Sequence, residues 1–87
     1  MFIKLTKESL ECYILICLNI QEMHRGQLFN NVCKHVNITP AKFYSALLIL
    51  ERDGKITRRY EISNGAAYDV YSITPTGQKD LNRFLKK

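Results

Sequence analysis

Basic side chains gather in the middle of this sequence, and their charge suits a polyanionic ligand. Between His24 and Arg59 there are seven Lys and Arg residues but only two acids, so this segment carries a net charge of +5. The whole chain of 87 residues also carries +5, so the remaining residues sum to zero. A positive field confined to one segment is typical of proteins that bind nucleic acid. A solvated basic surface without a ligand is the alternative interpretation of the charge alone.

The residues that usually perform catalysis or hold metals are not arranged for either task. His24 and His35 have no carboxylate or nucleophile at a spacing typical of an active site, and no glycine-rich phosphate loop is present. Cys33 and His35 are two positions apart, and such residues on a helix do not share a face. Cys12, Cys17 and Cys33 are an odd number without a Cys-x-x-Cys pair, which indicates reduced core thiols. We therefore expect no enzyme activity, no metal and no cofactor.

The length and composition predict one small domain, formed by residues 1–87, in the cytoplasm. Domains typically contain ~50–250 residues, and a chain this short buries more surface by pairing with a second copy. The longest apolar candidate for a membrane span, Cys12–Leu18, is far shorter than the ~20 residues that a bilayer requires. The first residues also lack the pattern of a signal peptide. We expect no membrane association and no small-molecule effector, for which the chain offers little room.

Three helices are predicted before residue 54. The first spans about Thr6–Ile20, and it is apolar over so much of its circumference that we expect burial on two sides, one of them facing another subunit or a core that wraps it. The second spans about Gln27–His35. The third spans about Pro40–Asp53, because Thr39 suits the N-cap, proline suits the first helical position and Gly54 suits the C-terminal end.

A β-hairpin and a short helix follow. Side chains alternate in character along Ile56–Ile62 and again along Ala66–Ile73, as expected of strands. The Asn64-Gly65 pair between them is a strong signal for a tight hairpin turn. A final helix opens at Thr74–Gly77 and continues to the end of the chain. The order of elements predicts an α+β, mostly α, winged helix-turn-helix with three helices, a two-stranded β wing and a C-terminal helix.

Two motifs in this arrangement resemble the PadR-like family of winged-helix regulators. One is a Tyr followed by Leu three and six residues later, then Glu and Gly: Tyr44, Leu47, Leu50, Glu51 and Gly54. The other is the Tyr-x-Leu/Ile-Thr-x-x-Gly ending of the wing, which MarR-like proteins share: Tyr71, Ile73, Thr74, Gly77 and Leu81. The resemblance covers nearly the whole chain. It implies a dimeric, DNA-binding transcriptional regulator, usually a repressor.

In such a regulator the third helix enters the major groove, where its N-terminal part usually reaches base edges. Lys42 can donate to guanine or to phosphate, and Ala41 can contact a thymine methyl group. The ring of Tyr44 either reaches DNA or packs against the second helix. Lys34 and Arg25 suit phosphate contacts, which position a protein on DNA without specifying sequence. The candidates outside the wing are Thr39, Ala41, Lys42, Tyr44, Ser45, Arg52, Lys34 and Arg25.

The wing is expected along the phosphate backbone or in the adjacent minor groove. Arg58 and Arg59 suit both places, but neighbouring strand residues point to opposite faces, so we expect only one of them to contact DNA. Arg59 shares a polar face and is expected toward solvent, whereas Arg58 shares an apolar face and is expected to pack. We therefore favour Arg59. Asn64 and Gly65 are further candidates at the tip, although a turn alone also explains them.

A dimer of this chain would use its first and last helices, because the long C-terminal dimerisation helices of larger family members are missing. The apolar residues expected at the dimer interface are Leu5, Tyr13, Ile16, Ile20, Leu81, Phe84 and Leu85.

One pair departs from the family pattern. The positions of Leu48 and Ile49 are commonly polar or basic in PadR-like proteins, so these residues either pack under the wing and last helix or make a protein contact. The favoured function is a sequence-specific, double-stranded DNA-binding transcriptional regulator that acts as a homodimeric repressor. The alternatives are a plasmid-partition adaptor that binds centromere repeats and a winged-helix module for protein interaction without DNA binding.

Overall fold

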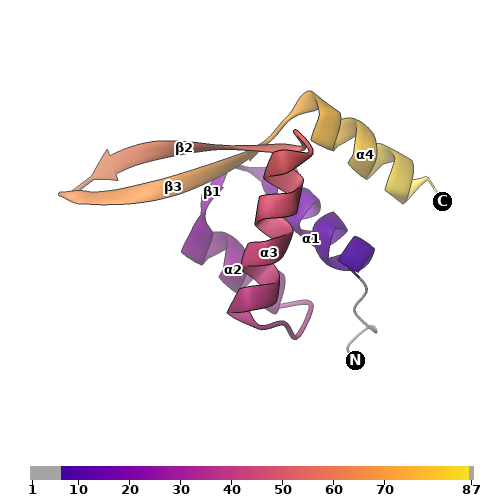
Figure 1. Ribbon diagram of the computed structural model, residues 1–87, viewed down its shortest axis with the longest axis horizontal. Helices are drawn as coiled ribbons and strands as arrows, with labels where there is room; N and C mark the ends of the chain where they lie inside the picture. The colour runs from indigo at the N-terminus through magenta and orange to yellow at the C-terminus, as the bar shows by residue number, and fades with distance from the viewer. Residues whose placement is uncertain (1–6, 87) are drawn as a thin grey trace.

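The computed structural model describes residues 7–86 as a helical body from which a long hairpin extends (Figure 1). The winged helix-turn-helix predicted from the sequence is confirmed, with a third, very short strand added to its sheet. The predicted start of the first helix, Thr6, lies outside the described residues. The elements are α1 (Lys7–Ile20), β1 (Met23–His24), α2 (Arg25–Cys33), α3 (Pro40–Arg52), β2 (Ile56–Ser63), β3 (Ala66–Ile73) and α4 (Pro75–Leu85).

Local capping explains where the helices begin. The Thr39 hydroxyl accepts a hydrogen bond from the backbone N–H of Lys42 at 3.3 Å, and α3 starts at the following proline. Helix α2 begins two residues earlier than predicted, because the Nδ1 atom of His24 accepts from the backbone N–H of Gln27 at 3.2 Å. Gly26 is therefore inside α2, although glycine in a sequence often marks a break between helices.

The sheet has the strand order β1-β3-β2, and both pairings are antiparallel. The hairpin turn predicted at Asn64-Gly65 is confirmed, with φ values of 53° and 79°. Strand β1, in which Met23 pairs with Tyr71, was not predicted, because two residues are too few to show a period. This strand joins the end of α1 to the base of the wing.

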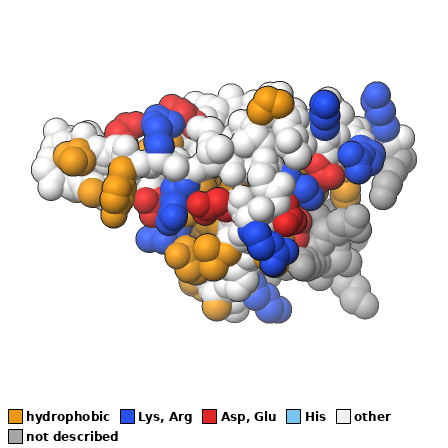
Figure 2. Space-filling model, turned by 45° about the horizontal axis from the view of Figure 1, so that its top comes forward, with side chains coloured by type: hydrophobic (Ala, Val, Ile, Leu, Met, Phe, Trp, Pro, Cys, Tyr) orange, Lys and Arg blue, Asp and Glu red, His pale blue; other side chains and the backbone are white. Residues whose placement is uncertain are grey.

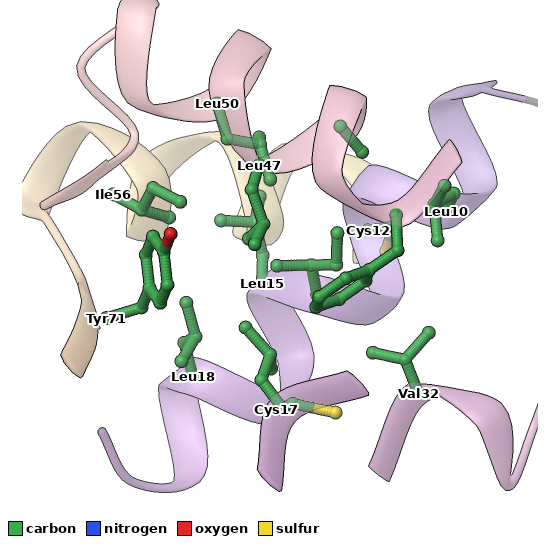
Figure 3. Close-up of a cluster of buried hydrophobic side chains, with 14 of the residues drawn as sticks. Leu10, Cys12, Leu15, Cys17, Leu18, Val32, Leu47, Leu50, Ile56 and Tyr71 are labelled. Atoms are coloured by element: carbon green, nitrogen blue, oxygen red, sulfur yellow. The ribbon is translucent and has the colours of Figure 1, made fainter. Parts of the chain in front are cut away.

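The core forms where α1 meets α3, β2 and β3. Figure 3 shows Leu47 and Leu50 of α3 pointing toward the side chains of α1, with Ile56 and Tyr71 beside them. All four are almost completely buried, and burial raises the pKa of the Tyr71 hydroxyl. Helix α1 also contacts α2 and α4, so the chain's own elements account for most of its apolar circumference.

Cys12 and Cys17 are free, buried thiols of this core, as predicted. Burial raises the pKa of both thiols, which keeps them protonated and unreactive. Cys33 is also free, and it is half-buried.

Helix α4 is held against the connection between α3 and β2 by a very close approach. A Cβ atom added to Gly77 would lie 2.2 Å from the carbonyl oxygen of Lys55 and 2.9 Å from Ile73 Cγ1. The same carbonyl accepts a hydrogen bond from the backbone N–H of Thr74 at 3.1 Å. Lys55 Nζ also lies 3.1 Å from a carboxylate oxygen of Asp80. Only glycine fits at position 77 without moving backbone.

The substitution Gly77→Ala should therefore destabilise the fold, by about 1–3 kcal/mol, as is typical of overpacking. Urea denaturation measures the change in the free energy of unfolding. Gly26→Ala is the matched control, because its added Cβ would meet its nearest neighbour, the His24 ring, at 3.7 Å, an ordinary contact. Equal stability of the two variants would contradict the steric account.

Candidate nucleic-acid interface

Helix α3 buries one face and projects the other. Phe43, Ala46, Leu47 and Leu50 are buried and hold the helix on the body. Between them, the first nine residues of α3 present exposed side chains of several chemical types. These are Ala41, Lys42, Tyr44, Ser45 and Leu48.

Cations without an acidic partner surround this face. Among residues 9–86, whose side chains are described, Arg25, Lys34 and Lys42 form no ion pair. The first acid of α3 is Glu51, near its C-terminal end. The positive charge predicted for the middle of the chain is therefore concentrated at the starts of α2 and α3, together with Lys34 at the C-cap of α2.

The ring of Tyr44 lies against the first residue of α2, Arg25, while staying accessible to solvent. The guanidinium carbon of Arg25 lies 5.4 Å from the centre of the Tyr44 ring, a cation–π contact. Tyr44 remains exposed, so its ring is not a core residue. Behind this pair, Phe29 and Phe43 meet edge-to-face at 5.1 Å and join α2 to α3. The contacts fix Arg25 beside the outward face of α3.

The other candidate cation of α3 is engaged. Arg52 Nε lies 3.3 Å from Asp53 Oδ1, and both side chains are well exposed, so the pair is weak. Thr39 is exposed but uses its hydroxyl as the N-cap of α3.

The two wing arginines lie on opposite faces of the sheet, as predicted, but their surroundings differ from the expectation. Arg58 pairs with Tyr71 in the register, on the face turned toward α3. Its guanidinium lies 3.6 Å from Glu51 and 3.9 Å from Asp69, and the nearby carboxylates, Glu51 first, raise its pKa. Since this face lies on the α3 side, we call it the inner face.

Arg59 lies on the outer face, which points away from α3. Its Nη2 atom donates to Glu22 and to Glu61, each at 2.8 Å, and Ser72 Oγ donates to Glu22 at 3.0 Å. These hydrogen bonds raise the pKa of Arg59 and lower the pKa of Glu22. The sequence analysis favoured Arg59 as the DNA contact, but the geometry favours Arg58. The reason is Glu22, a partner 37 positions away in the sequence.

Most of the wing is uncovered on both faces. Tyr60 and Ile62 of the inner face are each 79% exposed, so the packing expected for that face is wrong beyond Arg58. The hairpin extends past the helical body there, and Figure 2 shows hydrophobic side chains on its projecting part. Residues 60–78 contain no Lys or Arg, so the exposed tip at Asn64 and Gly65 carries no cation.

The candidate dimer surface lies between α1 and α4, where an apolar hollow is lined by Tyr13, Ile16, Phe84 and Leu85 among others. Ile20, at the end of α1, is exposed. One correction applies to the predicted set, at Leu81. Leu81 is only 3% exposed and packs in the core of its own chain instead. The Tyr13 ring already stacks on His35, with their centres 5.8 Å apart. Leu5 lies outside the described residues.

Leu48 and Ile49 do not behave as a pair. Leu48 is 48% exposed on the outward face of α3, whereas Ile49 is half-buried. Packing of Leu48 under the wing and last helix is therefore wrong.

Among residues 7–86, no group of three or more His, Cys, Asp and Glu side chains could hold a metal ion. None of the helices in this range has the length and hydropathy needed to cross a membrane.

Comparison with known proteins identifies the fold. No family model and no curated protein matches the sequence. Among solved structures, smu.1704 from Streptococcus mutans UA159 is 20% identical, with a TM-score of 0.91 over 99% of this chain and 81% of that one. A PadR family transcription regulator from Clostridium difficile R20291 is 21% identical, with a TM-score of 0.79 over 88% of this chain and 90% of that one. The chain has a PadR-like winged-helix fold.

One structure with a similar fold was solved in complex with DNA. PadR from Bacillus subtilis, in complex with operator DNA, is 21% identical, with a TM-score of 0.81 over 91% of this chain. The match covers 48% of the Bacillus protein. The resemblance inferred from the two sequence motifs is thus confirmed at the level of fold.

The network on the outer face of the wing predicts a pH dependence. Because the pKa of Glu22 is lowered, its carboxylate stabilises the folded state above its ordinary pKa, and this contribution is lost as the pH falls through the lowered value. We expect Glu22→Gln to melt below wild type at about pH 7 and the two melting temperatures to converge as the pH falls through the lowered pKa of Glu22. The difference in melting temperature is small, since the side chains of Glu22 and Arg59 are both half-exposed. In the Arg59→Ala background, Glu22→Gln should have a smaller effect, because only the hydrogen bond from Ser72 then remains. A constant difference across the pH range would contradict this account.

Proposed function

We propose that this protein is a sequence-specific, double-stranded DNA-binding transcriptional regulator that acts in the cytoplasm as a homodimeric repressor. The chain would act as one winged-helix domain over residues 1–87. The observation that carries the proposal is the exposed N-terminal half of α3, surrounded by Arg25, Lys34 and Lys42 without acidic partners.

In this proposal α3 lies in the major groove. Lys42 and Ser45 face the base edges or phosphates beside them, and Arg25 and Lys34 contact phosphates. The Tyr44 ring holds the guanidinium of Arg25 in place for that contact. The inner face of the wing, with Arg58 at its base, lies along the neighbouring backbone. Arg58 is paired with Glu51 and Asp69, which partly neutralise its charge, so it contributes less to DNA affinity than Lys42.

Similarity to solved structures supports the regulatory role. The relatives of the same fold include transcription regulators of the PadR family and the Bacillus subtilis protein bound to operator DNA. Since fold alone does not determine function, the unpaired cations on α3 and α2 are what connect this chain to that role.

The apolar hollow between α1 and α4 supports the homodimer. A chain of 10.1 kDa has a small core, and burying Phe84 and Leu85 against a second copy removes exposed apolar surface from water. Two copies would present their α3 helices to half-sites about 34 Å apart, one turn of the duplex.

Salt dependence of binding tests the DNA-binding proposal. On a duplex of random sequence, wild-type affinity should fall steeply with salt, and Lys42→Ala should reduce the slope of log affinity against log salt by about 1. Fluorescence anisotropy measures both. Lys79→Ala is the control, because this exposed lysine lies on α4, at the other end of the molecule from the wing (Figure 1). Binding that is absent or insensitive to salt would refute the proposal.

Charge placed on the α1–α4 surface tests the homodimer. We expect Leu85→Glu to weaken dimerisation at least ~10-fold, because an ionised carboxylate loses its hydration in an apolar interface. Sedimentation measures the mass, which should be twice 10.1 kDa for wild type. Ile62→Glu is the matched control, since this exposed apolar residue lies on the wing. At ~100 µM, a dimer with a micromolar dissociation constant would be almost fully formed. A wild-type protein that is monomeric at this concentration would exclude the interface.

A further inference from the structure

One stripe of the outward face of α3 is poor in groups that form hydrogen bonds with bases. Ala41, Ser45 and Leu48 recur at intervals of four and three residues, so they form one stripe along the helix. All three are exposed. Only the Ser45 hydroxyl can exchange a hydrogen bond with a base edge, whereas Ala41 and Leu48 offer methyl groups.

Leu48 is not required by the core. The neighbouring Leu47 and Leu50 are completely buried, but Leu48 leaves nearly half of its surface in water. Leu48 therefore leaves an apolar group available for contact on this face of α3. Lys42 lies on the same helix and Arg25 lies against Tyr44, both without acidic partners, so an anionic ligand that also carries an apolar group suits this face.

Duplex DNA meets both requirements at one place. The C5-methyl group of thymine is the apolar group that a base edge presents in the major groove, and phosphates line the groove on each side. We propose that Ala41 and Leu48 read thymine methyl groups, so that α3 selects its half-site through apolar contacts while Lys42 supplies affinity. This inference rests on the proposed function and specifies its sequence preference.

The helix geometry sets the spacing of the two thymines. Seven residues separate Ala41 from Leu48, which is about 10.5 Å along the helix axis at ~1.5 Å per residue. Base pairs repeat at ~3.4 Å, so a helix along the groove places the two methyl contacts about three base pairs apart. The same pair of positions recurs in the second half-site of a homodimer.

Replacing thymine by deoxyuridine removes only the methyl group and tests the proposal directly. Wild-type protein is first used to select tight-binding duplexes from a random library. Each thymine of a selected duplex is then replaced singly, and binding is measured by anisotropy. Two positions in each half-site should weaken binding, by about fourfold each, the value of one buried methyl-sized group.

Variants assign those positions to residues. Leu48→Ser should abolish the loss at one position, and Ala41→Gly should abolish it at the other. Lys42→Ala is the matched control, because it should weaken binding and its salt dependence but keep both methyl effects. Circular dichroism verifies that each variant is folded.

Three results would overturn the inference. The first is wild-type binding that no uridine substitution weakens beyond twofold. The second is a Leu48→Ser protein that retains both losses. The third is a Leu48→Ser protein that binds duplex normally but no longer self-associates on repeated sites, which would assign Leu48 to a second copy. If salt-dependent binding is present in any of these cases, the proposed function stands and only the methyl readout fails. If no duplex binds, both are refuted.

Discussion

The contact of α3 with α1 determines what the rest of the molecule can present. Leu47 and Leu50 are completely buried there, and each contributes about 1.5–3 kcal/mol by leaving water. Their burial fixes the rotation of α3 about its own axis, which decides that Lys42 and Leu48 point outward. The base of the wing rests on the same cluster through Ile56 and Tyr71. One small core therefore orients both surfaces that face a ligand.

Electrostatics divides the molecule into a charged and a compensated part. The wing arginines are paired with carboxylates on each face, and such exposed pairs contribute little stability but cancel the local field. Arg25, Lys34 and Lys42 have no such partners among the described side chains, so they leave uncompensated positive charge on α2 and α3. Three more exposed cations lie on α4, at the other end of the molecule: Lys79, Arg83 and Lys86.

Features with a local cause could be predicted from the sequence. The Thr-Pro pairs that start α3 and α4 and the Asn-Gly turn each depend on neighbouring residues, and all three have their expected roles. Features with a distant cause could not. The engagement of Arg59 depends on Glu22, and β1 exists because Met23 meets Tyr71 across the core. The apolar spacing that includes Leu81 is the same whether this face of the helix packs on its own chain or on a second copy. The candidate site also contains both kinds of feature. The alternation of side chains along the strand places Arg58 and Arg59 on opposite faces, but it does not show which face adjoins α3.

His24 connects two parts of the molecule that are usually described separately. It pairs with Val70 in the sheet, contacts the Tyr68 ring with ring centres 5.5 Å apart and planes tilted by 35°, and caps α2 immediately before Arg25. No linker separates the wing from the helix that carries this arginine, so neither can rotate without disturbing the other. The wing and the start of α2 are thus held at one separation by a single residue. Under the proposed function, a duplex that does not fit this separation would itself bend or change its groove width, and sequences that deform at low energetic cost would then be favoured at base pairs that no side chain contacts.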